Sequence, residues 1–370
     1  MYHSTDPRAA LAAAPVGTKP AATRFAGAEY AKFYETAPTE DQNGARTWYA
    51  RGQNFIIAYS DTDKGAVLSR TNQPDEYVVL LPDPGAGAEY AKFYETPPAE
   101  TQNGARTWYA RGQNFIIAYS DADKGAVLSR ADQPDEYVVL LPDPGSGAEI
   151  AWGNERLVVS GHSISFVPAG ASSVTLKGAA KVVRMMTTRS EDLAKRCSNA
   201  ASYAQAHPNL PPFEPWPEAA GGRKIRSYSL DVAPTPGRFG RIFRCSTFMV
   251  NFLEPKNGPR DTTKMSPHHH DDFEQCSLAL AGTFIHHLRW PWTTDMGEWR
   301  NDDHESCGSP SIAVIPPPAI HTSQAIDPKL NILVDIFCPP RVDFSAKPGW
   351  VLNADDYPMP VQTAAGKSAA

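Results

Sequence analysis

Three consecutive histidines with a nearby glutamate, and one histidine further along the chain, could together hold a metal ion. Residues 268–274 read His-His-His-Asp-Asp-Phe-Glu, and His321 ends the segment Pro-Pro-Pro-Ala-Ile-His. Imidazole is a ligand of iron, nickel, copper and zinc, and a carboxylate compensates part of the charge of the ion. Three imidazoles and one carboxylate would leave coordination positions open, as a catalytic metal site requires.

The spacing of these residues indicates that a β-strand presents them. His268 and His270 are two positions apart, so on a strand their side chains point the same way, whereas His269 points away. Glu274 lies four positions beyond His270 and faces the same side by the same alternation. The sequence therefore predicts that His268, His270 and Glu274 share one face.

The surrounding sequence resembles the two motifs of the cupin superfamily. The first motif of that superfamily is Gly-x5-His-x-His-x3,4-Glu-x6-Gly, and this chain has His268-x-His270-x3-Glu274-x7-Gly282. The second motif is Gly-x5-Pro-x-Gly-x2-His-x3-Asn, and here Gly308 begins the series Gly-x7-Pro-x-Pro-x2-His. That series ends at His321.

The departures from the motifs fall outside the ligand positions. Lys264 stands near the place of the leading glycine, Pro318 replaces the glycine of the second motif, and Ala325 stands where asparagine is expected. The resemblance implies a double-stranded β-helix, or jelly-roll, barrel around a metal. The ligands that it implies are His268, His270, Glu274 and His321.

The first half of the chain matches the same motifs only in part. Gly161-x6-Pro168-Ala169-Gly170 is similar to the second motif, but Ser173 or a neighbour occupies the histidine position. Residues 133–137 lie where the first motif would fall and contain no histidines. The chain therefore resembles a bicupin with a degenerate first barrel and one metal centre in the second.

Side chains around the second barrel suggest how a substrate could be held. Arg289 could bind a carboxylate through two hydrogen bonds, as could Arg300 in the long loop that follows. Trp290 ends the strand that begins after Gly282, and Gln324 lies three residues past His321. We predict Arg289, Trp290 and Gln324 as substrate-binding residues.

A near-identical tandem repeat precedes the first barrel. Segments 27–86 and 87–146 differ at only seven pairs of positions: Ala37/Pro97, Thr39/Ala99, Asp41/Thr101, Thr62/Ala122, Thr71/Ala131, Asn72/Asp132 and Ala86/Ser146. We expect the second copy to complete the first barrel because it adjoins the strands of residues 150–177. The first copy would then be surplus, and could add strands at an edge, swap between subunits, stay loosely ordered, or reflect a sequencing or assembly error.

Many short β-rich runs separated by turn residues predict an all-β sandwich or barrel in each half, with a short connecting helix and linker, and the cupin resemblance implies that both are jelly-roll barrels. Thr188-x-x-Glu191 resembles a capping box and predicts a helix to about residue 207. The expected organisation is a flexible segment 1–26, the surplus copy 27–86, a degenerate barrel 87–189, a helix and Pro-rich linker 190–223, a metal-binding barrel 224–345 and a tail 346–370.

Composition limits the function classes. A chain of 370 residues with 41% hydrophobic and 21% charged residues is typical of a globular protein, and its net charge of −6 argues against nucleic acid as a partner. We expect no membrane span, because no apolar run approaches eighteen residues, and no signal peptide. Five scattered cysteines favour free thiols and a cytoplasmic location. A homodimer is an expectation from the family resemblance alone.

The ligand set leads to a first hypothesis about function. We predict an oxidoreductase, an Fe(II) dioxygenase acting on a small, oxygen-rich, chelating substrate, with manganese, nickel or zinc as other possible metals. One alternative is a redox-neutral isomerase, lyase or decarboxylase of a small hydroxy or keto acid, in which the metal polarises a carbonyl. Another is a non-catalytic cupin that binds a small molecule.

Overall fold

The computed structural model divides the chain into two compact units, residues 1–79 and 80–370, and each is considered by itself. No helix in the described part of the chain is long and apolar enough to cross a membrane. The described residues are 38, 40–42, 45–51, 56–62 and 87–360, without 208, 293, 295, 297 and 298.

The first unit holds a small antiparallel sheet of three strands, β1 (Glu40–Gln42), β2 (Ala45–Arg51) and β3 (Ile56–Thr62), in that order. The second repeat copy forms the same meander from β5 (Glu100–Gln102), β6 (Ala105–Arg111) and β7 (Phe115–Ala122). The strand register is also the same, since Trp48 pairs with Tyr59 and Trp108 with Tyr119. The repeated sequence therefore specifies its local fold in both places.

The first barrel consists of two facing antiparallel sheets. The larger sheet has the order β15-β12-β9-β14-β7-β6-β5, and the smaller one β11-β10-β13-β8. Within these, β7-β14-β9-β12 facing β8-β13-β10-β11 is the strand order of an eight-stranded jelly roll. The remaining strands are β8 (Val127–Arg130), β9 (Tyr137–Leu141), β10 (Ala148–Trp152), β11 (Glu155–Val159), β12 (Ser163–Val167), β13 (Ser172–Leu176), β14 (Ala180–Thr187) and β15 (Arg226–Ser229).

The second barrel repeats this order. Its larger sheet runs β16-β17-β24-β19-β22-β4, and β21-β20-β23 faces it. In place of the eighth strand of the jelly roll, the second barrel has a single β-bridge between His268 and His321. The prediction of two all-β jelly-roll barrels is therefore confirmed. The strands are β16 (Arg241–Arg244), β17 (Met249–Phe252), β18 (Lys256–Asn257), β19 (Gln275–Ala281), β20 (Phe284–Arg289), β21 (Asp303–Cys307), β22 (Ser311–Ile315), β23 (Ile320–Ala325) and β24 (Leu330–Phe337).

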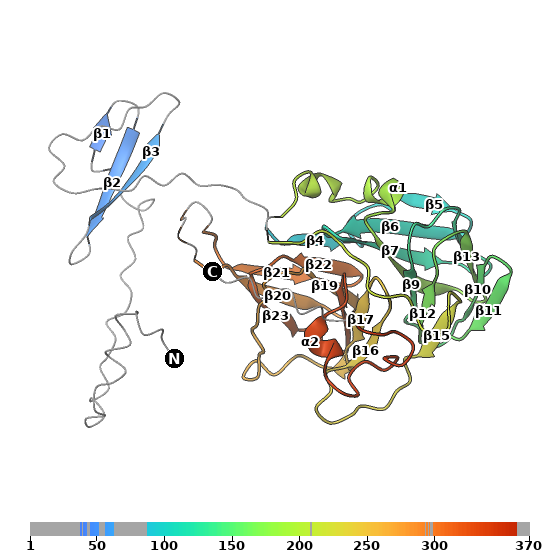
Figure 1. The fold of residues 1–370 in the computed structure, drawn as a ribbon. Helices are drawn as coiled ribbons and strands as arrows, with labels where there is room; N and C mark the ends of the chain where they lie inside the picture. The colour runs from blue at the N-terminus through green and yellow to red at the C-terminus, as the bar shows by residue number, and fades with distance from the viewer. Residues whose placement is uncertain are drawn as a thin grey trace, which may run out of the picture. The chain divides into compact units, whose positions relative to one another are not determined.

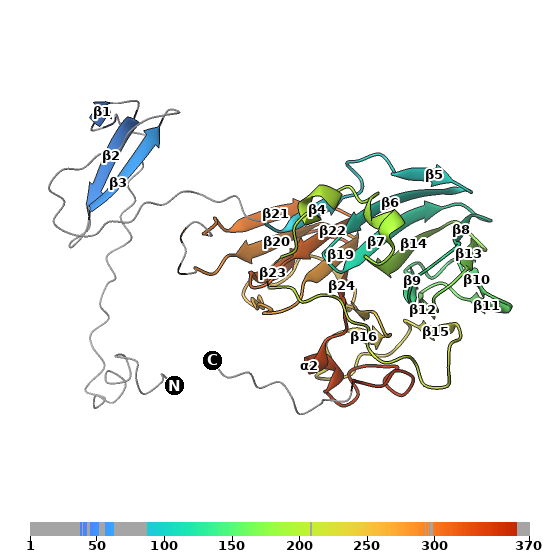
Figure 2. The ribbon, with the colours of Figure 1, turned by 45° about the horizontal axis from the view of Figure 1, so that its top comes forward.

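The strand β4 (Glu89–Lys92) lies within the range that we expected to form the first barrel. It pairs instead with β22 of the second barrel, where Tyr90 lies opposite Ala313. In Figures 1 and 2 this strand runs beside the orange strands of the second barrel before the chain enters the first. The repeat copy thus supplies strands to both barrels.

The helix predicted for residues 188–207 is mostly absent. Only α1 (Glu191–Ala194) and a 3-10 turn at Ala200–Tyr203 form there, with α2 (Val342–Ser345) near the other end of the chain. Thr188 does not cap the helix, because its hydroxyl donates to the carbonyl of Gln113. Asn199 pairs with the backbone of Arg111 and so fixes the chain outside the helix.

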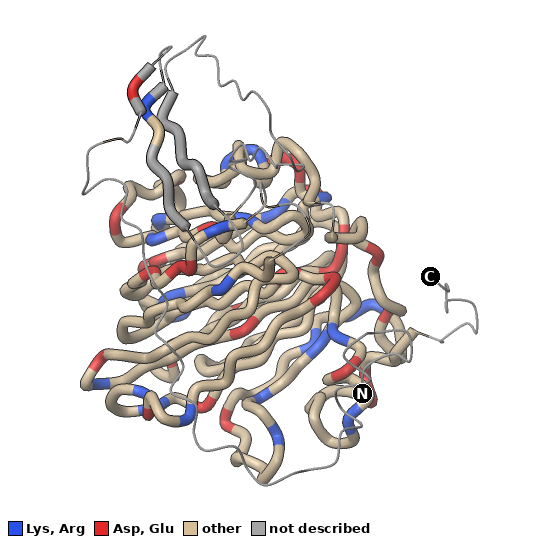
Figure 3. Tube along the Cα trace, turned by 90° about the vertical axis from the view of Figure 1, so that its left-hand side faces the viewer, with Lys and Arg blue, Asp and Glu red and all other residues tan. Residues whose placement is uncertain are grey.

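Alternate residues of the central strands fill two different cores. On β14, Val183 and Met185 join an apolar cluster shared by both barrels, whereas Val182 and Met186 join the interior of the first barrel. All five cysteines of the chain are free and buried. Basic and acidic residues are interspersed along the described chain, whereas most strand residues are uncharged (Figure 3).

Candidate metal centre

Three of the predicted ligands meet at the mouth of the second barrel. One ring nitrogen from each of His268, His270 and His321 lies within 4.8 Å of the others. The bridge between His268 and His321 brings the two histidine segments together, through hydrogen bonds of 3.1 and 2.7 Å between their backbones. A contact across more than fifty residues of sequence therefore builds the cluster.

Hydrogen bonds orient each imidazole and leave one nitrogen free. Nδ1 of His268 lies 2.9 Å from the carbonyl of Ser266, and Nδ1 of His321 lies 2.9 Å from that of Ala319. Nε2 of His270 lies 3.0 Å from the side-chain oxygen of Gln275. Each contact requires a protonated nitrogen, and in a neutral ring the other nitrogen then carries a lone pair, as in histidines that ligate metals.

Burial keeps two of the rings neutral. Desolvation lowers the pKa of His270 to about 3 and that of His321 to about 4, and Arg341 contributes in the same direction. Nε2 of His321 is buried without a hydrogen-bond partner. A buried nitrogen of this kind is costly unless it meets a ligand. His268 is exposed, so the cluster opens to solvent on that side.

A buried polar network supports the cluster from behind. The amide of Gln275 donates to Ser277 and Asp335, over 3.1 and 3.2 Å, and Ser277 donates to Asp335 over 3.0 Å. Desolvation raises the pKa of Asp335 to about 6. The network fixes the amide orientation of Gln275, and through it the tautomer of His270.

The donor set fits a divalent metal. Metal–nitrogen bonds of about 2.1 Å place three nitrogens of one ion about 3.0–3.6 Å apart, so nitrogens that lie within 4.8 Å of one another could bind one ion after a contraction of about 1–2 Å at most. Three neutral imidazoles are suitable ligands for manganese, iron, nickel or zinc. The cluster can therefore hold a divalent metal with open positions for a substrate.

Glu274, the fourth predicted ligand, does not join the cluster. The chain bends at residues 271–272 and β19 begins only at Gln275, so the strand alternation behind the prediction does not apply. The Glu274 carboxylate instead accepts a 2.7 Å hydrogen bond from the backbone of Gln113 in the first barrel. Desolvation raises its pKa to about 7. Glu274 thus belongs to the contact between the barrels.

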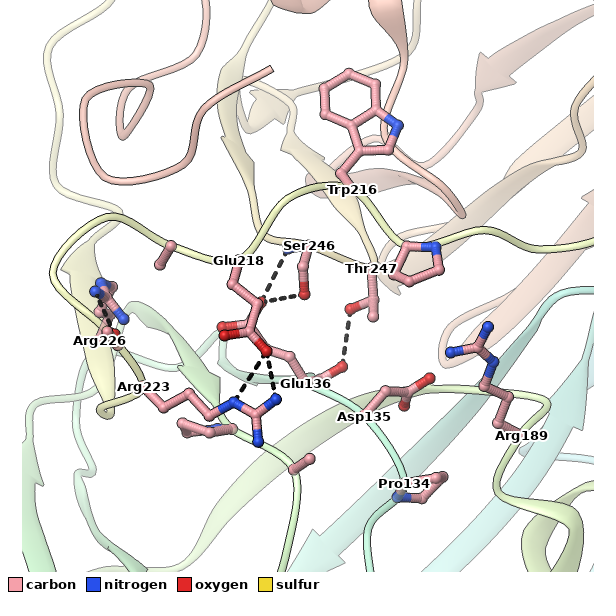
Figure 4. A pocket seen from close by; sticks show the side chains of 15 residues that line it. Pro134, Asp135, Glu136, Arg189, Trp216, Glu218, Arg223, Arg226, Ser246 and Thr247 are labelled. Carbon is pink, nitrogen blue, oxygen red and sulfur yellow. Dashed lines mark hydrogen bonds and ion pairs between the residues drawn. The ribbon is translucent and has the colours of Figure 1, made fainter. Parts of the chain in front are cut away.

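Glu136 of the first barrel makes the reciprocal contact. It lies just before β9, as Glu274 lies just before β19, and accepts 2.9 and 2.7 Å hydrogen bonds from the backbone and hydroxyl of Ser246. Its other oxygen accepts from Tyr357 over 2.7 Å. Figure 4 shows Glu136 extending toward Ser246 across the junction. Each barrel therefore caps a turn of the other with one glutamate.

The cavity drawn in Figure 4 lies at this junction and does not include the histidine cluster. It has a volume of 230 Å³. Most of its polar side chains are already engaged, since Glu218 pairs with Arg223 and the Arg226 guanidinium donates to backbone carbonyls. We regard it as part of the seam between the barrels.

Of the predicted substrate-binding residues, Arg289 and Gln324 point away from the barrel interior, whereas Trp290 is buried on the same side of the chain as His286 and Leu288. Arg289 is exposed, with 71% of its side chain accessible, and donates to Asp302. Gln324 accepts a hydrogen bond from His287 over 2.9 Å. Trp290 packs into an apolar cluster with Leu288 and Ile315. Alternation along β20 and β23 directs Arg289 and Gln324 outward.

Other polar groups face the barrel interior, and the sequence did not single them out. His286 is fully buried, its Nδ1 lies 2.9 Å from the Ser323 hydroxyl, and its Nε2 has no partner. Desolvation, with His321 nearby, lowers the pKa of His286 to about 4. The ring of Tyr90, from β4, lies 6.3 Å from that of His286, and its buried hydroxyl is also unpartnered. Tyr90 belongs to this barrel because β4 pairs with β22, a contact between distant segments that the sequence does not show.

The first barrel differs at the corresponding place. Within the described part of the chain, the only group of three or more metal-ligating side chains close enough to bind an ion is the one in the second barrel. In the first barrel Gln133 bonds to Gly170 through the backbone, much as His268 bonds to His321. The Gln133 side chain contacts Arg130 and Asp135 over 2.9 and 3.2 Å. The polar side chains at this place in the first barrel therefore pair with one another.

Comparison with known proteins gives distant structural similarity only. No protein family and no curated protein matches the sequence. AerE from Microcystis aeruginosa is 9% identical, with 69% of this chain and 98% of that chain covered at a TM-score of 0.45. Oxalate decarboxylase from Lactobacillus farciminis is 12% identical, with coverages of 72% and 88% and a TM-score of 0.46. A mutant oxalate decarboxylase from Bacillus subtilis is 12% identical, with coverages of 74% and 83% and a TM-score of 0.47.

The strand order of both barrels decides the fold. The chain has a bicupin fold. Two jelly rolls with the same strand order, joined by reciprocal glutamate contacts, form this bicupin, and its histidine cluster lies in the second barrel.

The prediction of an oxidoreductase is wrong. Several of the similar structures are oxalate decarboxylases, which are lyases and not dioxygenases. One of these was studied for its Mn(II) centres, and the three histidines of this chain suit several divalent metals and do not select iron. The four-ligand set behind the dioxygenase hypothesis also changes, because Glu274 lies outside the cluster. A divalent metal remains supported, and its identity stays open.

Proposed function

We propose that this bicupin is a metal-dependent enzyme that carries out a redox-neutral reaction on a small hydroxy or keto acid, as a lyase or decarboxylase. The observation that carries the proposal is the orientation of the three histidines. One nitrogen of each ring lies within 4.8 Å of the others, and one nitrogen of each ring is held by a protein acceptor. Such preorganisation is required of a metal centre that must keep open positions.

The charge at the cluster favours an anionic substrate. Three neutral imidazoles leave the charge of a divalent ion uncompensated, and the cationic Arg341 acts on both His270 and His321. A carboxylate with a neighbouring hydroxyl or carbonyl oxygen would neutralise this charge and chelate the ion. A bound metal would supply Lewis acidity, polarising the carbonyl or carboxylate of the substrate.

The barrel interior offers groups to bind and protonate such a substrate. The unpartnered Nε2 of His286 and the unpartnered hydroxyl of Tyr90 both lie inside the second barrel. Burial keeps the Tyr90 pKa above its ordinary value, so the hydroxyl holds its proton and can donate it in a hydrogen bond. We propose that His286 and Tyr90 orient the acid, and that His286 exchanges a proton with it.

A turnover experiment tests the proposal. The purified full chain would be loaded in turn with manganese, zinc, nickel and iron and supplied with small hydroxy, keto and dicarboxylic acids. Products would be followed by NMR, and carbon dioxide and oxygen by gas analysis. We expect conversion of an acid with no net consumption of oxygen. Oxygen consumption in step with conversion, or an inert metal-loaded protein with every acid, would contradict the proposal.

A further inference from the structure

A buried arginine inside the first barrel lacks any counter-charge. Arg184 lies on β14 between Val182 and Met186, which face the interior of that barrel, and only 3% of its surface is accessible. Its Nε atom is buried without a hydrogen-bond partner. Among the residues that the structure describes, no side chain forms an ion pair or hydrogen bond with its guanidinium.

The other charges nearby are already paired. Arg130 donates to Asp192 through two hydrogen bonds of 2.6 and 3.0 Å. Arg196 pairs with Glu100 and stacks on the Tyr109 ring at 5.0 Å. The local charges therefore sum to one unmatched positive charge, at Arg184. A guanidinium does not lose its proton in proteins, and a buried unpaired charge costs several kcal/mol.

A cavity adjoins this guanidinium. Its volume is 200 Å³, and Arg184 lines it together with Tyr109, Arg130 and the two carboxylates Glu100 and Asp192, which are paired with Arg196 and Arg130, respectively. A water molecule occupies about 30 Å³ in the liquid, so the cavity has room for an anion of a few heavy atoms. It lies inside the first barrel, whereas the histidine cluster lies in the second.

We infer that the first barrel is a binding site for a small anion, held by Arg184. A planar guanidinium binds two oxygens of a carboxylate or phosphate with parallel hydrogen bonds. The single unmatched charge favours a monocarboxylate over a phosphate dianion. The anion supplies the counter-charge that the protein itself does not provide.

Neutral hydroxyl groups complete the environment of the anion. Arg184 lies close enough to Tyr109 and Tyr137 to influence both, although burial raises the pKa of each hydroxyl and keeps it protonated. The Tyr137 hydroxyl lies 3.1 Å from that of Ser172 inside the same barrel. A protonated tyrosine can donate to an anion but cannot neutralise Arg184. The Tyr109 hydroxyl, which lines the cavity, donates to Glu100 over 3.4 Å, so neither tyrosine supplies the missing counter-charge.

Anion titration of the metal-stripped full chain tests the inference. Formate, acetate, lactate and inorganic phosphate would be titrated separately by calorimetry, with chloride-free buffer as the starting point. We expect one equivalent of a monocarboxylate to bind and to raise the melting temperature. Binding of phosphate with tenfold higher affinity than any carboxylate would overturn the assignment to carboxylates. Saturable binding of no anion would overturn the site itself.

Variants separate this site from the metal centre and from effects on folding. Arg184→Met should weaken the binding at least tenfold, whereas His321→Ala should leave it unchanged. Arg189→Met, which removes a charge outside the cavity, serves as the matched control and should bind like the wild type.

Stability without anion gives an independent readout. Arg184→Met should melt no lower than the wild type in anion-free buffer, because the substitution removes an unmatched buried charge. Added carboxylate should raise the melting temperature of the wild type only. Equal anion affinity in Arg184→Met, or loss of binding in His321→Ala, would count against the inference.

Discussion

At the scale of single residues, hydrogen bonds to the protein decide which histidine nitrogens are available. His268, His270 and His321 each have one nitrogen held by an acceptor. The acceptors are two backbone carbonyls and one amide, and only the amide of Gln275 can be removed by substitution. Gln275 therefore allows the orienting effect to be tested apart from ligation.

Substitution of the ligands and of Gln275 should affect metal binding to different degrees. His270→Ala and His321→Ala should abolish stoichiometric binding, since each removes a ligand nitrogen. Gln275→Leu should weaken metal affinity roughly 10–100-fold, because His270 loses the group that orients it. Glu274→Gln should retain the metal. Elemental analysis and metal titration measure this, and loss of the metal from Glu274→Gln would restore that residue as a ligand.

The outward and inward faces of β20 should differ in their effect on catalysis. His286→Asn should lower kcat/KM about tenfold or more while the metal is retained, because an inward polar group is altered. Arg289→Ala should change kcat/KM less than about twofold, since Arg289 is exposed and paired with Asp302. Steady-state kinetics with the acid found in the turnover experiment compares them. A reversed order would contradict the proposed interior site.

At the scale of elements, the repeat shows that the local sequence determines a three-stranded meander, but does not determine which other strands the meander joins. The same strands form in both copies, with the same register. Two of the seven differing positions are buried in the second copy, Ala122 and Ser146. Ala122 lies in the interior of the first barrel, where the first copy would supply the larger Thr62.

Deletion of either copy should leave a complete pair of barrels. Removal of residues 27–86 should not change the stability of the unit 80–370, because the second copy supplies β4 to β7. Removal of residues 87–146 joins the first copy to Gly147 instead. That protein should fold but be less stable by about 1 kcal/mol or more, since threonine replaces buried Ala122. Urea unfolding measures both, and collapse of the first deletion protein would show that the first copy is needed.

At the scale of the whole molecule, two glutamates join the barrels. Glu274 contacts the turn at Gln113 and Glu136 the turn at Ser246, in reciprocal fashion. Similarly, Asn199 pairs with the backbone of Arg111, and Asn353 with that of Arg244. The junction therefore has approximate two-fold symmetry, although only one barrel carries the histidine cluster.

The junction should be sensitive to pH through Glu274. Burial raises its pKa from 4.5 to about 7, so between these values the folded state binds more protons than the unfolded state. The contribution of Glu274 to the free energy of unfolding should therefore be fully present below about pH 4.5. It should be lost as the pH rises through about 7. The fall is on the order of 3–4 kcal/mol, from about 1.4 kcal/mol for each of the roughly 2.5 units between the pKa values 4.5 and about 7.

Comparison of Glu274→Gln with the wild type isolates this effect from that of Asp335, whose pKa is also raised. The variant should lose stability less steeply between pH 5 and pH 8, as measured by urea unfolding. Parallel curves for the two proteins would show that Glu274 does not titrate in this range.

The sequence by itself determined the all-β class, and its resemblance to the cupin motifs implied the two jelly rolls and three residues of the histidine cluster. Turn residues, short β-rich runs and the spacing of His268, His270 and His321 carry these features, because local patterns encode strands and motif order. The prediction that Glu274 shares a face with His268 and His270 was wrong for a local reason, because side chains alternate between two faces only while the chain stays extended. Bends at residues 271–272 end that regularity before β19.

Only the tertiary structure decided which side chains share an interior. In the folded protein, β4 and Tyr90 belong to the second barrel, and His286 is buried there near His321. The side chains of Arg289 and Gln324 point outward. The fold also buries Arg184 inside the first barrel. Such neighbours come together through pairing of distant strands and through burial, and the free energy of both depends on contacts that no local stretch of sequence contains.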